Sequence, residues 1–477
     1  MKRPITILTV ALAFLVSHPA IGDELDYEGS SSPVGSTVHV DLQPVGYSVY
    51  VGDDGCDGCT DGCSGCADGC ATRGSSRGRN GSLFGSKACG CNGNAACGSC
   101  QNSWDSFCGD SCGGCGSCQA DSFCRRWGGV EYLHVWTKGR ALPPLVTEGT
   151  LPGFARLNGV DSATVVFGDH DIGQDLKSGA RVVAGTWLDE YALVGVGVKL
   201  MGVEDDSTSF YASAPGTDNV VLARPYYDTN PALPPQENSF IVARMMDGLQ
   251  PFTASGNVAV NASHDIYIGD AFARYMLKCE KGHRLDLVGG YLYSRFDDGI
   301  EIISNTTVGA DVVTVADHFN TINELHAGGM GLLSEYEHGP VTVSMMGRVN
   351  VGDMRQKVNI RGFTNINNSP HPVTPDSGLF ARSETNAGQY ERQQIVVMPE
   401  VNFNMTYAVS NNLDISVGYT FMYWNNVVLA AEQIDRNVNG DQLADGVINA
   451  GPQDPSFSFV DSDYYIHAIN IGLIGRF

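Results

Sequence analysis

Apolar and polar residues alternate along most of the chain. Between Ile395 and Tyr407 most odd-numbered positions are apolar, whereas the even-numbered positions include Glu400, Asn402 and Asn404. The same alternation runs through residues 194–200, 341–351 and 413–424. A period of two is typical of β-strands that have one apolar and one polar face.

This pattern predicts ten strands. They span residues 127–137, 178–189, 192–202, 264–280, 284–296, 324–337, 341–357, 395–407, 412–425 and 464–477. Tight turns are expected at residues 189–191, 280–283, 338–340 and 408–411. Long connections are expected at residues 138–177, 203–263, 297–323, 358–394 and 426–463. Short turns at one end and long loops at the other are the layout of an outer-membrane barrel.

A soluble sandwich of two sheets would show the same alternation, but not this division of short and long connections. The predicted fold is therefore an all-β, antiparallel transmembrane barrel of about ten strands, within a range of about 10–12. Both ends of the barrel chain are expected on the short-turn side. A further hairpin around 240–246 would widen the barrel.

Aromatic residues support a membrane setting, because they gather toward predicted strand ends as a girdle does. They are Trp127, Tyr132, Trp136, Tyr291, Tyr293, Tyr407, Tyr423, Trp424, Tyr464 and Tyr465. The last strand ends at Phe477, which resembles the signal that delivers outer-membrane barrels to their assembly machinery. Gly475 departs from the apolar residue usual at that place.

The first residues predict export. Lys2 and Arg3 precede an apolar stretch from Ile5 to Val16, and small residues suited to cleavage end at Gly22. We therefore expect a signal peptide at residues 1–22. No later apolar run reaches about 18 residues, which argues against a helical membrane protein.

Residues 23–125 form an extension rich in Cys and Gly, which lacks the apolar residues needed for a core. Disulfides are the expected state in an exported chain, although the spacing does not define their pairing. Zinc binding by Cys-x-x-Cys pairs and disulfides to other envelope proteins are the alternatives. The disulfide candidates are Cys56, Cys59, Cys63, Cys66, Cys70, Cys97, Cys100, Cys112, Cys115 and Cys118.

The chain is acidic, with 29 Lys and Arg against 53 Asp and Glu and a net charge of -24. This balance excludes a general nucleic-acid-binding protein, which needs a basic surface. The hydrophobic share of 43% is enough to build a folded domain.

Charges of both signs fall on the polar faces of the predicted strands. They are Arg181, Lys199, Asp270, Arg274, Lys278, Asp286, Arg348, Glu400 and Asp414. Barrels of about eight strands are filled by side chains, whereas water-filled porins use about 16 to 18. We therefore expect ion pairs that fill a narrow lumen, with an open pore as the alternative.

One acidic loop has the ligand spacing of a calcium site, at Asp435, Asn437, Asn439 and Asp441. Gly446 stands where such a loop has its bidentate Glu, so an ordinary acidic turn is the other interpretation. We expect no cofactor, with calcium at this loop as the alternative.

Two Asp-His neighbours suggest a hydrolase at the barrel rim as a remote alternative. Asp169-His170-Asp171 and Asp317-His318 both fall in predicted loops, and a carboxylate beside His can activate water. Neighbours in sequence need not face each other, and no nucleophile or phosphate-binding motif accompanies them. We expect that the protein is not an enzyme.

Several short blocks follow one another in a fixed order. They are Trp127-Gly-Gly-Val-Glu-Tyr-Leu, Leu142-Pro-Pro-Leu-Val-Thr, Gly179-Ala-Arg, Gly185-Thr-Trp-Leu-Asp, Asp317-His-Phe-Asn-Thr-Ile-Asn-Glu, Met398-Pro-Glu, Gly418-Tyr-Thr-Phe-Met-Tyr-Trp-Asn-Asn-Val-Val and Glu432-Gln-Ile-Asp. Together they resemble the planctomycete β-barrel porin family seven over residues 127–477. The resemblance implies an outer-membrane β-barrel of unestablished activity, since "porin" describes a fold there.

The predicted organisation is a signal peptide, the Cys/Gly-rich extension and a barrel at residues 126–477 in the cell outer membrane. We expect a structural or surface-interaction role in the envelope, with passive diffusion of small solutes as the alternative. The expected partners are outer-membrane lipid, the barrel-assembly machinery and, through the Cys-rich segment, other envelope proteins.

Overall fold

The computed structural model describes residues 126–476, apart from 159–160, 162, 190, 233, 248–251, 281, 368–375, 442 and 444–450. The predicted signal peptide, the Cys-rich extension, its disulfide candidates and Phe477 lie outside the described residues. In the part of the chain that the structure describes, no helix has the length and apolar composition needed to cross a membrane.

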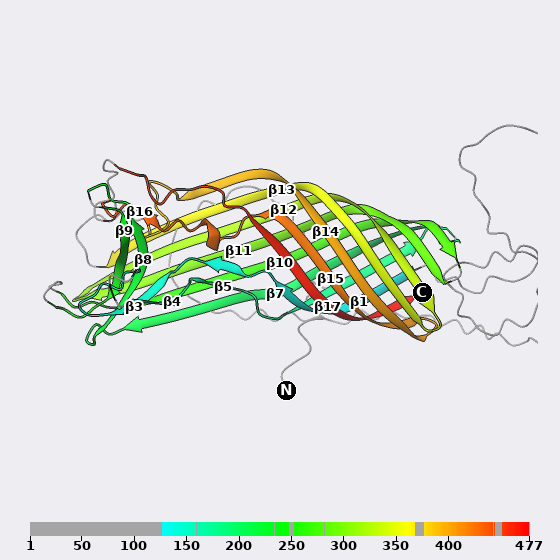
Figure 1. The fold of residues 1–477 in the computed structure, drawn as a ribbon, viewed down its shortest axis with the longest axis horizontal. Helices are drawn as coiled ribbons and strands as arrows, with labels where there is room; N and C mark the ends of the chain where they lie inside the picture. Colours follow the sequence, from blue (N-terminus) through cyan, green and yellow to red (C-terminus); the bar gives the residue numbers. More distant parts are fainter. Residues whose placement is uncertain are drawn as a thin grey trace, which may run out of the picture. The chain divides into compact units, whose positions relative to one another are not determined.

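Ten antiparallel strands form a closed barrel (Figure 1). They are β1 (Arg126–Thr137), β6 (Lys177–Trp187), β7 (Val194–Ala214), β10 (Ser255–Glu280), β11 (His283–Val308), β12 (Asp311–His338), β13 (Val341–Asn367), β14 (Gly388–Ser410), β15 (Leu413–Val427) and β17 (Ser462–Arg476). Around the barrel their order is β1-β17-β15-β14-β13-β12-β11-β10-β7-β6. The pairing of β1 with β17 closes the sheet, and the prediction of an all-β barrel of about ten strands is confirmed.

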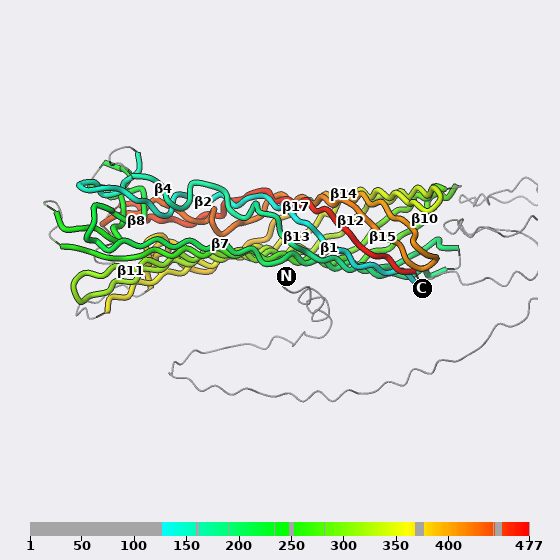
Figure 2. The backbone as a smooth tube through the Cα atoms, turned by 90° about the horizontal axis from the view of Figure 1, so that it is seen from below, coloured from blue at the N-terminus to red at the C-terminus, as the bar shows by residue number. Residues whose placement is uncertain are grey.

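Short elements occupy the end of the barrel opposite to the C-terminus (Figure 2). They are β2 (Arg140–Leu142), β3 (Val146–Thr150), β4 (Thr164–Phe167), β5 (His170–Ile172), β8 (Val220–Asp228), β9 (Gln236–Ala243), the 3-10 helix η1 (Ala431–Gln433) and β16 (Asn437–Val438). Strands β3, β4, β8, β9 and β16 form a separate five-stranded sheet. The hairpin considered around 240–246 therefore exists in part, as β8 and β9, but it does not widen the barrel.

The long strands extend well beyond the predicted ones. A transmembrane strand needs about 9–11 residues, yet β12 has 28. The expected long connection at 297–323 is wrong, because β11 continues to Val308 and β12 begins at Asp311. Gly309 takes a positive φ of 62° in the tight turn between them, a conformation that glycine adopts without strain.

The alternation of faces reverses along these strands. Near the short turns the outward positions are apolar and exposed, as at Met345 (57% exposed) and Met405 (45%). Toward the other end the apolar residues point inward, and Val260, Ile302 and Phe319 are buried in one core. We call the first region the membrane band and the second the outer sleeve, comprising residues 255–266, 296–308, 311–324, 355–367 and 388–394. In outer-membrane barrels an outward apolar band of this kind faces lipid. The sleeve instead buries its apolar residues in a core, as a water-soluble domain does.

The predicted aromatic girdle holds only in part. Tyr291 of the predicted girdle faces outward and hydrogen-bonds His326 at 2.5 Å. Tyr419, which was not predicted, makes the same contact with His467 at 2.5 Å. Three others of the predicted girdle point inward instead: Trp127 lines the interior, while Trp424 and Tyr464 are fully buried. The period of two assigns these positions to the inner face, which their aromatic character by itself did not reveal.

A cluster of carboxylates lies on the outer face of the sleeve, beyond the membrane band. Asp265 of β10 pairs directly with Asp297 of β11, and a β-bulge in the β7–β10 pairing brings Asp205 close to it. Burial, a hydrogen bond with Asp205 and the charges of Asp205 and Asp297 raise the pKa of Asp265 from 3.8 to about 7. Arg295 neutralises Asp297 at 2.9 Å, but no such cation relieves Asp265 among the described residues.

We predict that this cluster makes the barrel less stable as the pH rises through about 4 to 7. In this range Asp265 stays protonated in the folded protein and is ionised in the unfolded chain. The free energy of unfolding therefore falls as the pH rises. Asp265→Asn should raise the unfolding temperature at pH 8 and flatten its pH dependence, whereas Asp353→Asn, an exposed position of β13, should do neither. An unchanged pH profile in Asp265→Asn, measured by circular dichroism in detergent, would contradict the prediction.

Candidate functional site

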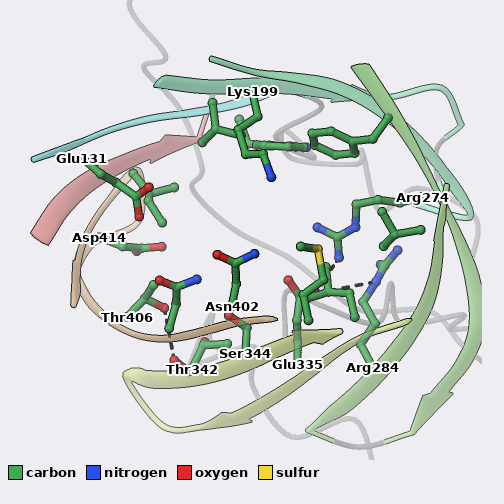
Figure 3. Close-up of a pocket in the computed structure, with 18 of the residues that line it drawn as sticks. Glu131, Lys199, Arg274, Arg284, Glu335, Thr342, Ser344, Asn402, Thr406 and Asp414 are labelled. Carbon is green, nitrogen blue, oxygen red and sulfur yellow. Dashed lines mark hydrogen bonds and ion pairs between the residues drawn. The ribbon is translucent and has the colours of Figure 1, made fainter. Parts of the chain in front are cut away.

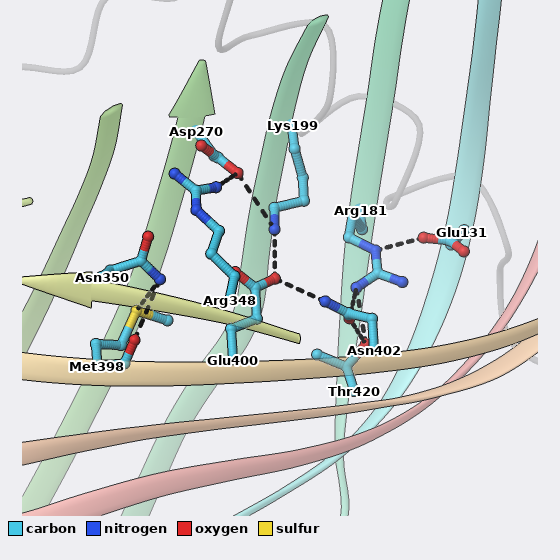
Figure 4. A network of polar contacts seen from close by, with 10 residues as sticks. All are labelled: Glu131, Arg181, Lys199, Asp270, Arg348, Asn350, Met398, Glu400, Asn402 and Thr420. Carbon is cyan, nitrogen blue, oxygen red and sulfur yellow. Dashed lines mark hydrogen bonds and ion pairs between the residues drawn. The ribbon is translucent and has the colours of Figure 1, made fainter. Parts of the chain in front are cut away.

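An ion pair crosses the lumen of the barrel (Figure 4). Lys199 projects from β7 and Glu400 from β14, and these strands are five places apart in the ten-strand order, whichever way the barrel is followed. The Lys199 Nζ lies 2.5 Å from the Glu400 Oε1. Because the two strands lie opposite each other, this contact bridges the full width of the lumen.

Further polar side chains complete this network. Lys199 Nζ also lies 3.4 Å from Asp270 Oδ2, which accepts a hydrogen bond from Arg348 Nη1 at 2.6 Å. Asn402 Nδ2 donates to Glu400 Oε1 at 2.8 Å. Glu400 is fully buried and Arg348 is 2% exposed, so water has little access to these charges. Each charge meets an opposite one, which offsets part of the cost of burial. Four buried atoms of these charged groups have no hydrogen-bond partner among the described residues, namely Arg348 Nε and Nη2, Asp270 Oδ1 and Glu400 Oε2.

The close packing requires glycine on the strand next to Arg348. A side chain at Gly329 of β12 would collide with the guanidinium of Arg348 and the amide of Asn350. Glycine at this position lets the arginine lie flat against the backbone of the neighbouring strand. The glycine content of the strands thus contributes to the filling of the lumen.

A second arm of the network lies beside the first. Arg181 of β6 forms an ion pair with Glu131 of β1 and donates to Thr420 Oγ1 at 2.8 Å. The same guanidinium lies 3.4 Å from Asn402 Oδ1, which connects it to the lysine network. Asn402 and Thr420 stand on the polar faces of alternating runs but carry no charge, so they were not among the predicted charged positions. Glu131 was not predicted, because its neighbours on the inner face of β1 include Trp127 and Leu133.

Eight of the nine positions predicted on the basis of charge lie in the interior, namely Arg181, Lys199, Asp270, Arg274, Asp286, Arg348, Glu400 and Asp414. Arg274 donates to Asp286 at 2.8 Å and to Glu335 at 2.7 Å. The expectation for Lys278 is wrong. A β-bulge after Met276 turns this lysine outward, where it pairs with exposed Glu280 at 2.9 Å.

A vestibule lies between the charged network and the short turns (Figure 3). Its volume is about 310 Å³, near the lower limit for a small-molecule site. Arg284 donates to Asp286 at 2.8 Å and lies 4.4 Å above the ring of Trp187. Lys199, Asp270 and Arg348 line its inner part, so the charged network forms the end of the vestibule.

An apolar layer lies on the far side of the network. Phe296 packs edge-on against Trp424 at 4.9 Å and against Tyr464 at 5.4 Å between ring centroids. Leu133 and Leu292 belong to the same fully buried cluster. The residues of this cluster are apolar or aromatic, and a charge buried among them would be costly without a partner.

The outer connections are anchored to the sleeve by buried ion pairs. Arg140 of β2 pairs with Asp298 at 2.5 Å and with Asp206 at 3.1 Å. Arg224 of β8 pairs with Asp317 of β12, and both side chains are fully buried. The three levels together fill the barrel: the outer elements, the apolar layer and the charged network.

The structure separates the Asp and His residues considered for hydrolysis. Asp317 and His318 lie in β12 rather than in a loop, and consecutive strand positions face opposite sides. Asp317 faces inward and accepts backbone N–H groups of Phe380 and Ala381 at 2.8 Å each. His170 Nδ1 contacts the carbonyl of Gly168 at 2.7 Å. These contacts assign structural roles to Asp317 and His170.

The residues of the predicted calcium loop anchor turns. Asp435 accepts hydrogen bonds from the backbone of Asn437 and Ser456 at 2.9 Å each. Asn439 is fully buried and accepts a hydrogen bond from the backbone N–H of Asp441. The carboxylate of Asp441 accepts a hydrogen bond from the Asn230 side chain. Gly446 lies outside the described residues. Among the residues that are described, no cluster of three or more His, Cys, Asp or Glu side chains is arranged to hold a metal ion.

Solved outer-membrane proteins resemble this chain only distantly. A FadL homologue of Pseudomonas aeruginosa is 8% identical, with 74% of this chain and 90% of that chain covered and a TM-score of 0.20. OmpT of Vibrio cholerae is 8% identical, with 73% and 98% covered and a TM-score of 0.14. The toluene transporter TodX of P. putida is 9% identical, with 74% and 90% covered and a TM-score of 0.13. At these TM-scores the similarities carry no argument about function.

The family comparison is more direct. No curated protein matches the chain. The family described as "Putative beta barrel porin-7" matches residues 127–477, which span the ten strands of the barrel. The chain therefore belongs to this family of porin-like outer-membrane β-barrel proteins.

Proposed function

We propose that this outer-membrane barrel has a structural or surface-interaction role in the cell envelope and that its lumen does not conduct. The observation that carries the proposal is the contact between Lys199 and Glu400 across the full width of the barrel. A solute would have to break this ion pair and also displace the apolar layer around Phe296. Passive diffusion, the alternative, would require both layers to open.

The sleeve supports a role at the surface. It extends the folded structure beyond the membrane band, and the five-stranded sheet adds to it at the end opposite to the short turns. The membrane band supplies the contact with outer-membrane lipid, and the barrel-assembly machinery is the partner during insertion. We further propose that the Cys-rich extension links the barrel to other envelope proteins, that the protein performs no enzymatic turnover and that no cofactor takes part.

We predict that the full mature chain, refolded in detergent and added to a planar bilayer, inserts without discrete conductance steps. A general diffusion porin added to the same bilayer serves as the control for insertion. Stable steps that scale with salt concentration would overturn the sealed lumen and favour the porin alternative.

A second prediction concerns the energy of the charged network. Lys199→Met leaves Glu400 buried and unpaired, so the free energy of unfolding should fall by about 3–5 kcal/mol. Adding Glu400→Leu should restore most of this loss, because a hydrophobic pair replaces the ion pair. Lys278→Met is the matched control, since its exposed ion pair should contribute less than about 1 kcal/mol. Urea unfolding in detergent, followed by tryptophan fluorescence, measures all four proteins. A Lys199→Met variant as stable as the Lys278→Met variant would show that the network does not stabilise the barrel.

The envelope role gives a third prediction. Deletion of the gene in its native host should increase sensitivity to detergent and leave the uptake of small hydrophilic solutes unchanged. Complementation with the Lys199→Met/Glu400→Leu variant should restore resistance, because that variant keeps the barrel filled. Slower solute uptake with intact detergent resistance would be the signature of a diffusion channel instead.

A further inference from the structure

A second cavity lies on the outward face of the sleeve and has no connection to the charged network. Its volume is about 680 Å³, and it is an open groove rather than an enclosed chamber. The groove lies where β14 begins at Gly388. Strand β13 continues past this point, beyond its pairing with β14. The lining residues are His318, Asn320, Asn359, Ile360, Arg361, Gly362, Phe363, Asp376, Ser383, Ala387, Gly388 and Gln389.

Three side-chain amides form a row along this groove. Asn320 of β12 pairs in register with Asn359 of β13, which pairs with Gln389 of β14. Adjacent strands lie about 4.8 Å apart, and an amide offers both a donor and an acceptor. The row therefore presents hydrogen-bond donors and acceptors at about this spacing across three strands.

An aromatic surface stands beside the amides. The rings of His318 and Phe363 stack with centroids 6.1 Å apart and an interplanar angle of 26°. Phe363 is 38% exposed although it lies on a polar, outward face. An exposed aromatic ring on a water-facing strand is suited to cover the C–H face of a ligand. Amides and a flat ring together match the two chemistries of a sugar, its hydroxyl edge and its apolar face.

The charges of the groove argue for a neutral ligand. Arg361 is held by Asn359 Oδ1 at 3.1 Å, and Asp376 supplies a carboxylate to the same groove. His318 Nδ1 lies 3.3 Å from Glu301 Oε1. Neither sign dominates, unlike in a site for phosphate or sulfate, where several cations converge.

We propose that this groove binds a neutral oligosaccharide of the cell surface. The proposal rests on the surface role inferred above and names the chemistry of the partner. Phe363 covers the apolar face of a sugar ring, while Asn320, Asn359 and Gln389 hydrogen-bond its hydroxyl groups. The sleeve holds the groove beyond the membrane band, on the side opposite to the periplasmic turns.

Titration of the full mature chain with maltohexaose, cellohexaose, chitohexaose and mannohexaose tests the proposal. At least one should bind with a dissociation constant below about 1 mM, equivalent to about 4 kcal/mol. Phe363→Ala and Asn359→Ala should each weaken that binding at least tenfold, whereas Phe363→Tyr should retain it. Asn365→Ala is the matched control. Asn365 is an exposed residue two positions after Phe363 in β13, and it does not line the groove.

Circular dichroism and heat-modifiability on gels verify that each variant is folded. Absence of binding by all four oligosaccharides at 10 mM would overturn the proposal, and so would binding that Phe363→Ala leaves intact. Either result leaves the sealed lumen standing, because conductance and detergent sensitivity are measured independently of sugar binding.

Discussion

Closure of a sheet of only ten strands is the constraint on which the rest of this structure depends. The pairing of β1 with β17 satisfies the last open edge, and the small circumference brings opposite walls within reach of each other. Side chains from β7 and β14 then meet across the axis. Since a charge in so narrow a space has little water, it must find an opposite charge there. The mixture of signs on the inward faces follows from this geometry.

Along one strand, the same alternation of apolar and polar residues suits two environments, lipid around the membrane band and water around the sleeve. In the membrane band the apolar side chains face lipid and the polar ones face the lumen, whereas in the sleeve the arrangement is reversed. On β11, for example, Arg284 and Asp286 point inward near the turn and Ile300 and Ile302 point inward in the sleeve. The exchange needs no change in backbone geometry, because a strand always presents two faces. A continuous barrel can therefore join a membrane-spanning part to a part stabilised by an ordinary apolar core.

The inside of the barrel and the outer face of the sleeve carry different features. Inside, buried pairs such as Arg224 and Asp317 tie the outer sheet to the barrel wall. Outside, the polar face of the sleeve is free to carry recognition chemistry, since it need not contact lipid. This division supports the proposed role at the outward surface.

The sequence by itself determined the strand number, the alternation, the position of the short turns and most of the charged residues that face inward. These features are local, because a period of two and a turn residue are defined by neighbours along the chain. It did not identify the sleeve strands, although the run Gly299-Ile-Glu-Ile-Ile and the Gly309 turn were present, because a reversal of the apolar face resembles the end of a strand. The inward positions of Trp424 and Tyr464, the partner of each charge and the row of amides on three strands were decided by the tertiary structure. Each of them depends on barrel closure or on strand register, which bring together residues far apart in the chain.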